Sequence, residues 1–512
     1  MDQLTLITFL PLVGALLVLL TPASQEKVLR AIALVTTLVV AVLGVRLYLQ
    51  FDGASAALQC AVDKPWFVLP GSAIAVRYKL GVDGLSILMV VLTAVLMPTV
   101  ILSTWGHIHK RVKEFMVWML VMQTGMLGVF LATDLVLFYF FWEVSLIPLY
   151  FMVGIWGGER RLYATIKFFL YTLAGSLVML VAVIALIYHF RTADIETLCA
   201  QAGSLELTKQ LWLFAGFALA FSIKVPLLPF HTWLADAHTE APTSGSVVLA
   251  GVLLKMGTYG LLRFGVDMFP AASLELAPLF MALGAVGIVY GAFLAMAQTD
   301  VKRLVACSSV SHLGYVVLGM FALTRAGLSG SILQMVNHGI STGLLFLLIG
   351  MIYERRHTRA LDQFGGIAST MPIFAFFLVF TVLSSAALPG LNGFVGEYLI
   401  LLGAFQAKPL WAIIGVLGVI FGAVYLLVAT RRVLFGPVTH EENKHLEDLN
   451  VREIGLMLPM VVLAVWIGFQ PTPFLDQSRG SLDRVMKKIE LARGAQSAAL
   501  EVQPLTTEEV VR

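Results

Sequence analysis

Long apolar stretches, separated by short polar segments, follow one another along nearly the whole chain. Stretches of about 18 or more apolar residues, bounded by charged residues, Gly and Pro, predict about fourteen membrane-spanning helices. We place these spans near residues 3–20, 28–50, 83–104, 114–132, 134–154, 162–190, 211–236, 243–267, 272–296, 301–323, 328–353, 371–404, 408–434 and 453–471. The interval from about Phe51 to Val82 contains the alternating run SAIAVRYKLGV, which predicts a short hairpin outside the bilayer. The predicted fold is therefore an all-α polytopic membrane protein.

Composition supports this class. The chain has 512 residues, of which 59% are hydrophobic and 13% charged, whereas soluble domains carry roughly 25% charged residues. The first span follows an acidic start and precedes many others, so we interpret it as a retained helix and not a cleaved signal peptide. Cys60, Cys199 and Cys307 lie far apart without a CxxC motif, which supports neither an iron–sulfur cluster nor a zinc site.

Basic residues predict the orientation of the spans. Sixteen Lys and Arg residues lie in or beside the connections that follow odd-numbered spans, and nine lie in or beside the others. The positive-inside rule places the first set in the cytoplasm and both termini outside. Three basic residues, Lys167, Lys224 and Lys255, are then left inside spans. The tail from about Phe474 has helical spacing in SLDRVMKKIELA and predicts a surface helix that is solvated or contacts another subunit.

Buried polar residues recur in two parts of the chain. The fourth to eighth spans can be laid over the ninth to thirteenth, and five spans per unit make the second copy enter from the opposite side. Glu143 then maps near His312, Lys167 near His338, and Lys224 near Glu397, at offsets of 169, 171 and 173. We therefore expect four segments: residues 1–112, a first repeat at 113–268, a second inverted repeat at 269–436, and 437–512.

Two spans contain signals for a break. Pro226 and Pro229 follow Lys224 in the seventh span, and the motif SSAALPGLNGFVGEYL precedes and includes Glu397 in the twelfth. Proline disrupts helical hydrogen bonding, and broken helices at corresponding positions of two repeats indicate a transport site. The seventh and twelfth spans are expected to be discontinuous, with Lys224 and Glu397 as the two centres.

Ionisable residues at membrane depth are costly and therefore indicate function. Glu143 lies near the middle of its span, and its expected partner is Lys224; a shift of this carboxylate relative to the lysine could act as a switch. Lys255 is also central, without an acid at i±3 or i±4 on its helix. Lys167 lies close to the end of its span, so a snorkelling side chain is an equally good interpretation.

Two histidines complete the predicted row. A lone histidine on an apolar face is usually a packing residue, but His312 and His338 fall at repeat-related positions and titrate near physiological pH. His231 lies two turns beyond Lys224. Its spacing to neighbouring His and Glu residues matches no standard zinc pattern, so no metal is expected. Similar depth on successive helices suggests proton transfer along the membrane plane.

Three motifs carry a family resemblance. At FWEVSLIPLYF, FSIKVPLLPFHTWLADAHTEAPTSGSVVLAG and LPGLNGFVGEYLI, the chain resembles the antiporter-like membrane subunits of respiratory complex I, the proton-pumping NADH:quinone oxidoreductase. The resemblance covers essentially the whole chain. Glu397, where related subunits carry lysine, and the lack of a long lateral helix match the M-subunit group, the counterpart of mitochondrial chain 4.

The resemblance implies both function and site. It implies a proton-translocating subunit whose relay comprises Glu143, Lys224, Lys255, His312, His338 and Glu397, with Lys167 and His231 as less certain members. It places flavin and iron–sulfur centres in partner subunits, with no cofactor, redox centre or separate quinone site in this chain. The expected location is the bacterial inner membrane, beside lipids and the neighbouring L and N subunits.

Two alternatives remain open at this point. The first is a subunit of a multisubunit sodium/proton antiporter or a membrane-bound hydrogenase, which share the motif around Lys224. The second is a structural membrane scaffold in which the buried charges are inert.

Overall fold

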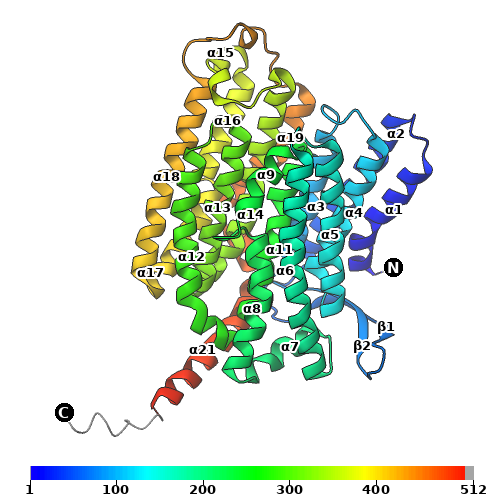
Figure 1. Ribbon diagram of the computed structural model, residues 1–512, viewed down its shortest axis with the longest axis vertical. Helices are drawn as coiled ribbons and strands as arrows, with labels where there is room; N and C mark the ends of the chain where they lie inside the picture. Colours follow the sequence, from blue (N-terminus) through cyan, green and yellow to red (C-terminus); the bar gives the residue numbers. More distant parts are fainter. Residues whose placement is uncertain (1, 502–512) are drawn as a thin grey trace, which may run out of the picture.

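The computed structural model describes residues 2–501, and nearly all of this part of the chain is helical (Figure 1). The helices are α1 (Gln3–Leu20), α2 (Glu26–Gln50), α3 (Ile87–Ser103), α4 (Val112–Leu131), α5 (Leu135–Trp156), α6 (Arg161–Phe190), α7 (Ile195–Gln201), η1 (Ala202–Ser204), α8 (Leu207–Lys224), α9 (Thr232–Glu240), α10 (Thr243–Val248), η2 (Leu249–Leu253), α11 (Leu254–Gly260), η3 (Leu261–Asp267), α12 (Pro270–Met296), α13 (Val301–Phe321), α14 (Arg325–Arg356), η4 (Leu361–Gln363), α15 (Ile367–Thr370), α16 (Pro372–Ser385), α17 (Asn392–Ala407), α18 (Pro409–Leu434), η5 (Glu441–Asn443), α19 (Val451–Phe469), α20 (Thr472–Asp476) and α21 (Arg479–Glu501). Within residues 2–501, 11 helices are long and apolar enough to cross a membrane. The all-α membrane fold predicted from the apolar stretches is confirmed, whereas the count of fourteen spans stays a prediction.

The two spans with break signals are each divided into two helices. α8 ends at Lys224 and α9 begins at Thr232, while α16 ends at Ser385 and α17 begins at Asn392. Lys224 is thus the last residue before one break, whereas Glu397 lies in the second turn after the other. A further irregularity was not predicted: the span from Thr243 to Asp267 contains two π-helical segments, η2 and η3.

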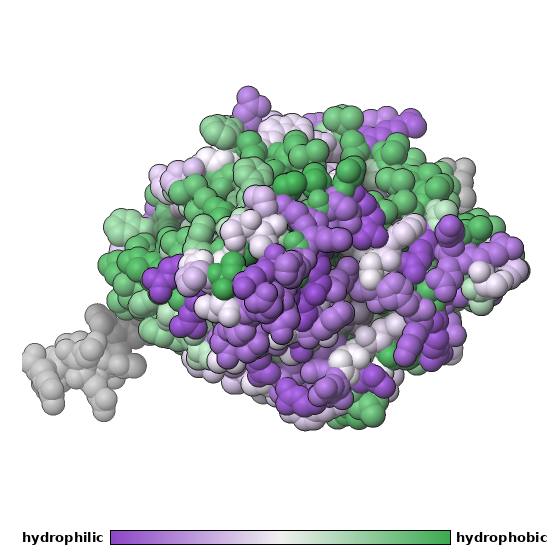
Figure 2. Space-filling view, turned by 90° about the horizontal axis from the view of Figure 1, so that it is seen from above, coloured by the Kyte–Doolittle hydropathy of each residue, from purple (hydrophilic) through white to green (hydrophobic). Residues whose placement is uncertain are grey.

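The two ends of the helical bundle differ. At one end, β1 (Gln59–Val68) pairs antiparallel with β2 (Ala75–Val82), which confirms the predicted hairpin, and α7 and α21 lie at the same end (Figure 1). We call this the hairpin end, and the opposite end the α15 end. Seen from the α15 end, a hydrophilic face is bordered by hydrophobic sides (Figure 2), as expected for a protein surrounded by lipid.

The centre of the bundle is formed by helices that are enclosed by other helices. In the most apolar 18-residue stretch of each span, all residues are buried in Thr243–Asp267, α13 and α14, whereas only 39% are buried in α1, α2 and α18. A helix that is buried on every side needs small residues for close packing. An added Cβ on Gly284 of α12 would lie 2.8 Å from the Leu318 nitrogen of α13. Polar residues on α13 and α14 are therefore shielded from the lipid.

The starts of α5 and α13 are set by equivalent caps. The Asp134 carboxylate accepts hydrogen bonds from the backbone N–H groups of Val136 and Leu137, at 2.9 and 3.2 Å. Asp300 caps α13 in the same way. Such caps satisfy otherwise unpaired donors in the first turn. They position Glu143 in α5 and His312 in α13 about two to three turns into their helices.

Candidate functional site

Lys224 lies at the break between α8 and α9. Its side chain is buried, and its Nζ has no hydrogen-bond partner within residues 2–501. The ammonium nitrogen lies 5.6 Å from the ring centroids of both Trp142 and Phe168. Aromatic faces attract a desolvated cation, so these two rings contribute to its stabilisation.

Glu143, the expected partner of Lys224, follows Trp142 directly on α5. Its Oε1 is buried and also has no hydrogen-bond partner in the described part of the chain. The carboxylate is close enough to act electrostatically on Lys224, but the two groups are not hydrogen-bonded. The pair is therefore positioned for attraction without being locked together, which leaves Lys224 free to form other contacts.

Close backbone packing brings Lys224 near the helix that carries Lys255. An added Cβ on Gly257 of α11 would lie 3.0 Å from Cβ of Lys224 and 2.8 Å from Cγ2 of Val225. Only glycine allows the two helices to approach this closely. Lys255 lies about half a turn before Gly257 on the same helix.

Lys255 makes direct contact with α14. Its Nζ lies 2.6 Å from Nδ1 of His338 on α14 and donates a short hydrogen bond to the carbonyl of Ala250. Ala250 belongs to the π-helical segment η2, and π-helical turns inside α-helices are frequent at functional sites. The lysine that lacked an acid on its own helix is thus held by an imidazole and a carbonyl.

The row continues from His338 to Glu397. The ring centroids of His338 and His312 are 5.8 Å apart. Nδ1 of His312 lies 3.1 Å from Oε1 of Glu397, and the Gln334 amide donates to the same oxygen at 3.1 Å. The hydroxyl of Tyr425 lies 3.4 Å from Nε2 of His312. These contacts link α13, α14, α17 and α18 around one buried carboxylate.

The second break positions Glu397 through a polar bridge. Asn337 of α14 donates to the backbone carbonyl of Asn392, the first residue of α17, at 2.7 Å. The hydroxyl of Ser384, at the end of α16, donates to the side-chain oxygen of Asn392 at 2.6 Å. Asn392 therefore joins both halves of the broken span to α14 and fixes the turn that precedes Glu397.

The two less certain members lie beside the row. Lys167 forms an ion pair with Asp236 of α9 at 2.7 Å, and Arg303 of α13 binds the other oxygen of this carboxylate at 3.2 Å. Lys167 is thus a paired lysine and does not extend freely to the membrane surface. His231 packs edge-on against Tyr290, with ring centroids 5.3 Å apart.

Sequence reasoning missed three buried basic residues inside spans. The expectation that only three lie inside spans is wrong, because Arg30 is buried in α2, Arg263 in η3 and Lys302 in α13. Arg263 lies near the end of its span, beside a polar connection. The signal that could have identified it is the four-residue spacing of Lys255, Tyr259, Arg263 and Asp267, which places four polar groups on one helix face.

His238 of α9 is a further group that the sequence did not single out for proton transfer. Its ring stacks on Phe346 at 4.7 Å, and both ring nitrogens are without a hydrogen-bond partner in residues 2–501. It lies within electrostatic reach of Lys302 and Lys255. Lys302 also lines a cavity of about 570 Å³ at the α15 end, together with Glu240. This cavity brings polar surface from the α15 end towards the row.

The arrangement suits proton transfer between neighbouring groups. General acid–base transfer requires heavy atoms roughly 2.6–3.2 Å apart or one bridging water, and the Lys255–His338 and His312–Glu397 contacts meet this requirement. No group of three or more His, Cys, Asp or Glu side chains in residues 2–501 is arranged to hold a metal ion. The row therefore contains two pairs of ionisable groups at hydrogen-bonding distance and three wider intervals, between Glu143 and Lys224, between Lys224 and Lys255, and between His338 and His312.

Comparison with known proteins agrees with this chemistry. The family described as NADH:quinone oxidoreductase/Mrp antiporter, TM, matches residues 132–422. NADH-quinone oxidoreductase subunit M of Rhodobacter capsulatus is 44% identical over 491 residues, which cover 93% of this chain and 94% of that protein. NADH-ubiquinone oxidoreductase chain 4 of Arabidopsis thaliana is 40% identical over 478 residues, covering 93% and 95% of the two chains.

Solved structures share the fold. A chain of respiratory complex I from Thermus thermophilus superposes with a TM-score of 0.86 at 33% identity, covering 95% of this chain and 99% of that chain. A chain of the Mrp complex from a Dietzia species gives a TM-score of 0.82 at 21% identity, with 96% and 99% covered, and shows the likeness of the fold alone. The resemblance stated from the motifs is confirmed: the chain belongs to the family of NADH-quinone oxidoreductase subunit M, whose mitochondrial counterpart is chain 4.

Proposed function

We propose that this chain translocates protons across the membrane as the M-type subunit of NADH-quinone oxidoreductase. The observation that carries the proposal is the buried row in which Lys255 contacts His338 and His312 contacts Glu397. Burial of four ionisable groups inside a membrane bundle costs folding free energy, and such groups usually mark a transport path. The relay comprises Glu143, Lys224, Lys255, His338, His312 and Glu397, with Lys167 and His231 beside it.

The proposed proton movement starts at Glu143 and ends at Glu397. Quinone reduction elsewhere in the complex rearranges charge along neighbouring membrane subunits and shifts Glu143 relative to Lys224. Lys224 then passes its proton to Lys255 on the neighbouring helix, which Gly257 allows to pack closely against Lys224. His338 and His312 carry it to Glu397, which releases it outside. Hydrated intervals bridge Lys224 to Lys255 and His338 to His312, where the structure supports no direct hydrogen bond.

Redox cofactors belong to partner subunits in this proposal. The chain's three cysteines lie in three separate elements, Cys60 in β1, Cys199 in α7 and Cys307 in α13. An iron–sulfur cluster needs several thiolates together, so these residues do not fit one. The chain carries no redox centre of its own, and its enzymatic role is that of a proton-translocating subunit of the oxidoreductase.

Location and partners follow from the charge pattern and the family. We assign the chain to the bacterial inner membrane, with the hairpin end and both termini on the periplasmic side. The apolar sides of the bundle contact lipid and the neighbouring antiporter-like L and N subunits. Exposed apolar residues such as Leu162, Leu170 and Val181 on α6 support such contacts.

The division into two inverted repeats receives support from backbone contacts. An isolated antiparallel bridge pairs Asp134 with Asp194, and another pairs Asp300 with Ala360; both residues are displaced by 166 positions. We therefore retain segments at 1–112, 113–268, 269–436 and 437–512, although residues 502–512 lie outside the described part. The recurring bridges close equivalent ends of the two repeats.

Replacement of Lys224 by Ala tests the relay. NADH-driven acidification of inverted membrane vesicles should fall by about a hundredfold or more, the low end of proton-transfer contributions. Glu143→Gln should give the same direction of change. Lys209→Ala is the matched control, because Lys209 is an exposed lysine on the same helix. Normal pumping in both relay variants, with normal assembly, would favour the structural scaffold and overturn the proposal.

The antiporter alternative has a separate test. A sodium/proton antiporter subunit would dissipate an imposed pH gradient in a sodium-dependent manner without NADH. We expect the purified complex to show NADH-dependent pumping and no such sodium dependence. Co-purification with NADH dehydrogenase and other antiporter-like subunits identifies the assembly directly.

A further inference from the structure

The helix that carries Lys255 has a second polar end, at the hairpin side of the bundle. Tyr259, Arg263 and Asp267 follow Lys255 at four-residue intervals, and Arg263 binds both other groups: its Nε donates to the Tyr259 hydroxyl at 3.4 Å and its Nη1 to Asp267 at 3.1 Å. Tyr259 is one turn, roughly 6 Å, from Lys255 along the helix axis. A continuous polar face thus leads from the relay towards the hairpin end.

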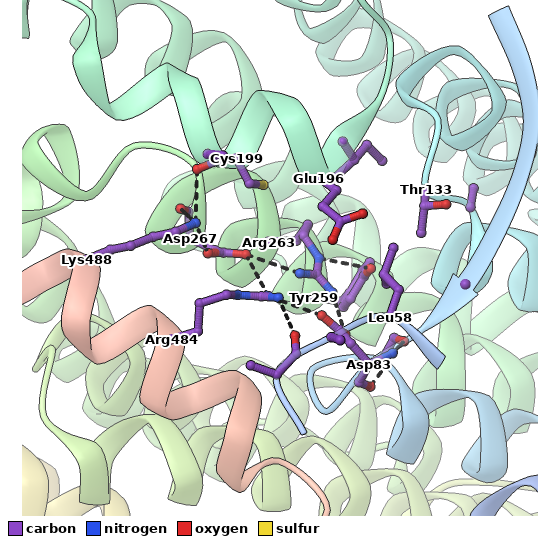
Figure 3. Close-up of a pocket in the computed structure, with 17 residues that line it drawn as sticks. Leu58, Asp83, Thr133, Glu196, Cys199, Tyr259, Arg263, Asp267, Arg484 and Lys488 are labelled. Carbon is purple, nitrogen blue, oxygen red and sulfur yellow. Dashed lines mark hydrogen bonds and ion pairs between the residues drawn. The ribbon is translucent and has the colours of Figure 1, made fainter. Parts of the chain in front are cut away.

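This face opens into a cavity. A cavity of about 390 Å³ is lined by Tyr259, Arg263 and Asp267, together with Asp83 and residues of α7 and α21 (Figure 3). The cavity is large and polar enough to hold several waters. It therefore extends the surroundings of the hairpin end to within about one helical turn of Lys255. Unless something opposes them, protons on that side could reach the middle of the relay without passing Glu397.

Five charged side chains beside Tyr259 in this cavity are joined by ion pairs, while a sixth, Glu196, pairs instead with Lys79 at 3.6 Å. Asp83 binds Arg263 at 2.5 Å and Arg484 of α21 at 3.2 Å. Asp267 binds Arg263 at 3.1 Å, Arg484 at 3.3 Å and Lys488 of α21 at 2.5 Å. Figure 3 shows both α21 side chains reaching inward to these carboxylates. All four carboxylate oxygens are engaged by cations, so protonation of either carboxylate from the cavity would weaken these ion pairs.

The two cations from α21 decide the sign of the net charge of this five-charge cluster. Without α21, two carboxylates and Arg263 leave one excess negative charge, which would attract protons. Arg484 and Lys488 change this to one excess positive charge, which repels them. Arg263 cannot be deprotonated in a protein, so the innermost cation is permanent. The tail helix, expected to be only solvated or in contact with another subunit, is therefore a structural part of the bundle.

We propose that Arg263, Arg484 and Lys488 form an electrostatic barrier that prevents protons at the hairpin end from returning to Lys255. The barrier insulates the first repeat, so that protons leave only by way of Glu397. The inference rests on the proposed function, because it concerns leakage into that relay, but its residues lie outside the six relay groups.

The test is passive proton permeability of the whole complex in liposomes, measured without NADH from the decay of an imposed pH gradient, with the hairpin side acidic. Arg484→Gln with Lys488→Gln should accelerate the decay on the order of tenfold, since removal of two nearby charges reverses the sign of the cluster. Lys487→Gln removes the same charge from an exposed neighbouring position and should change nothing. Lys488→Gln alone should give a smaller increase and serves if the double variant does not assemble.

A charge-compensated variant separates electrostatics from anchoring of the helix. Asp267→Asn with Lys488→Gln loses an anchoring ion pair but keeps one excess positive charge, so it should remain tight. Two results would overturn the proposed barrier. One is a leak in this variant equal to that of Lys488→Gln, and the other is the absence of a leak in Arg484→Gln with Lys488→Gln. The leak should also disappear when Lys255→Ala is added to the leaking variant. If the leak persisted, protons would not be returning by way of Lys255 and the proposed route would be overturned. Normal NADH-driven pumping by Lys224→Ala overturns the proposed relay and leaves these passive measurements unchanged.

Discussion

The Lys255 ammonium nitrogen and Nδ1 of His338 lie 2.6 Å apart in the centre of the bundle. When Lys255 is protonated it donates to Nδ1, and the neutral imidazole then carries its own proton on Nε2. Nε2 of His338 has no hydrogen-bond partner in the described part of the chain. The contact therefore couples the protonation of Lys255 on α11 to the tautomer of His338 on α14.

Replacement of His338 by Gln should separate hydrogen bonding from proton transfer. The Gln amide oxygen can accept from Lys255 but cannot take up the proton. We expect normal assembly and a decrease in NADH-driven proton translocation of at least about tenfold, measured by vesicle acidification. His189→Gln, at an exposed position of α6, is the control. Unchanged pumping in His338→Gln would show that protons do not pass through this ring.

Glu397 should tolerate a shorter acid better than a neutral isostere. Glu397→Gln preserves the shape and the contact with Gln334 but removes the ionisable group, so pumping should fall by about tenfold or more. Glu397→Asp retains the acid but withdraws it from His312, now at 3.1 Å, and should lose less. The initial rates of acidification rank the two variants. An equal loss in both would mean that geometry, and not titration, sets the requirement.

Gly257 should not accept a side chain. Its added Cβ would lie 2.8 Å from Val225 and 3.0 Å from Lys224 and from the Phe221 carbonyl oxygen. Gly257→Ala should therefore destabilise the subunit by about 1–3 kcal/mol and lower pumping, because Lys224 is displaced. Thermal unfolding of the purified complex in detergent measures the first effect. Gly422→Ala is the control, since nothing lies within 4 Å of its added Cβ, and equal stability of both variants would contradict the packing.

Cys60 should report the orientation of the chain. Its thiol is exposed on β1, whereas Cys199 and Cys307 are buried, and burial raises the pKa of the Cys199 thiol to about 12. Since the thiolate is the reactive form, a membrane-impermeant maleimide should label Cys60 alone. Labelling is expected in right-side-out spheroplasts and absent in intact inverted vesicles; the reverse pattern would place the hairpin end in the cytoplasm. Cys60→Ser is the control for specificity.

The sequence identifies the buried ionisable residues better than it identifies the residues that each of them contacts. Apolar length and proline positions are local properties, so the all-α membrane fold and both helix breaks could be predicted from the chain. The contact between Lys255 and His338 depends on how their two helices are rotated about their axes. The spacing of apolar residues along each helix does not determine this rotation. Glu143 and Lys224 illustrate the same limit, because opposite charges at similar depth suggested a close pair, yet aromatic rings surround the lysine.

The hairpin end was least accessible to sequence reasoning. Arg263 follows an apolar run and resembles a loop residue, and its carboxylate partners, Asp83 and Asp267, lie 180 and 4 positions away. Arg484 joins them from the other end of the chain. No local pattern signals such a convergence, because the helical spacing of α21 specifies its amphipathic face and not the surface that receives it.

Asp236 of α9 is a counter-ion shared by two helices that are far apart in the chain. Lys167 of α6 binds one carboxylate oxygen and Arg303 of α13 binds the other. The chain passes from η3 to α12 at the opposite end of the bundle. If either cation moved away, Asp236 would keep only one of these ion pairs. Movement of α6 relative to α13 near the α15 end therefore also changes the balance of charge around Asp236.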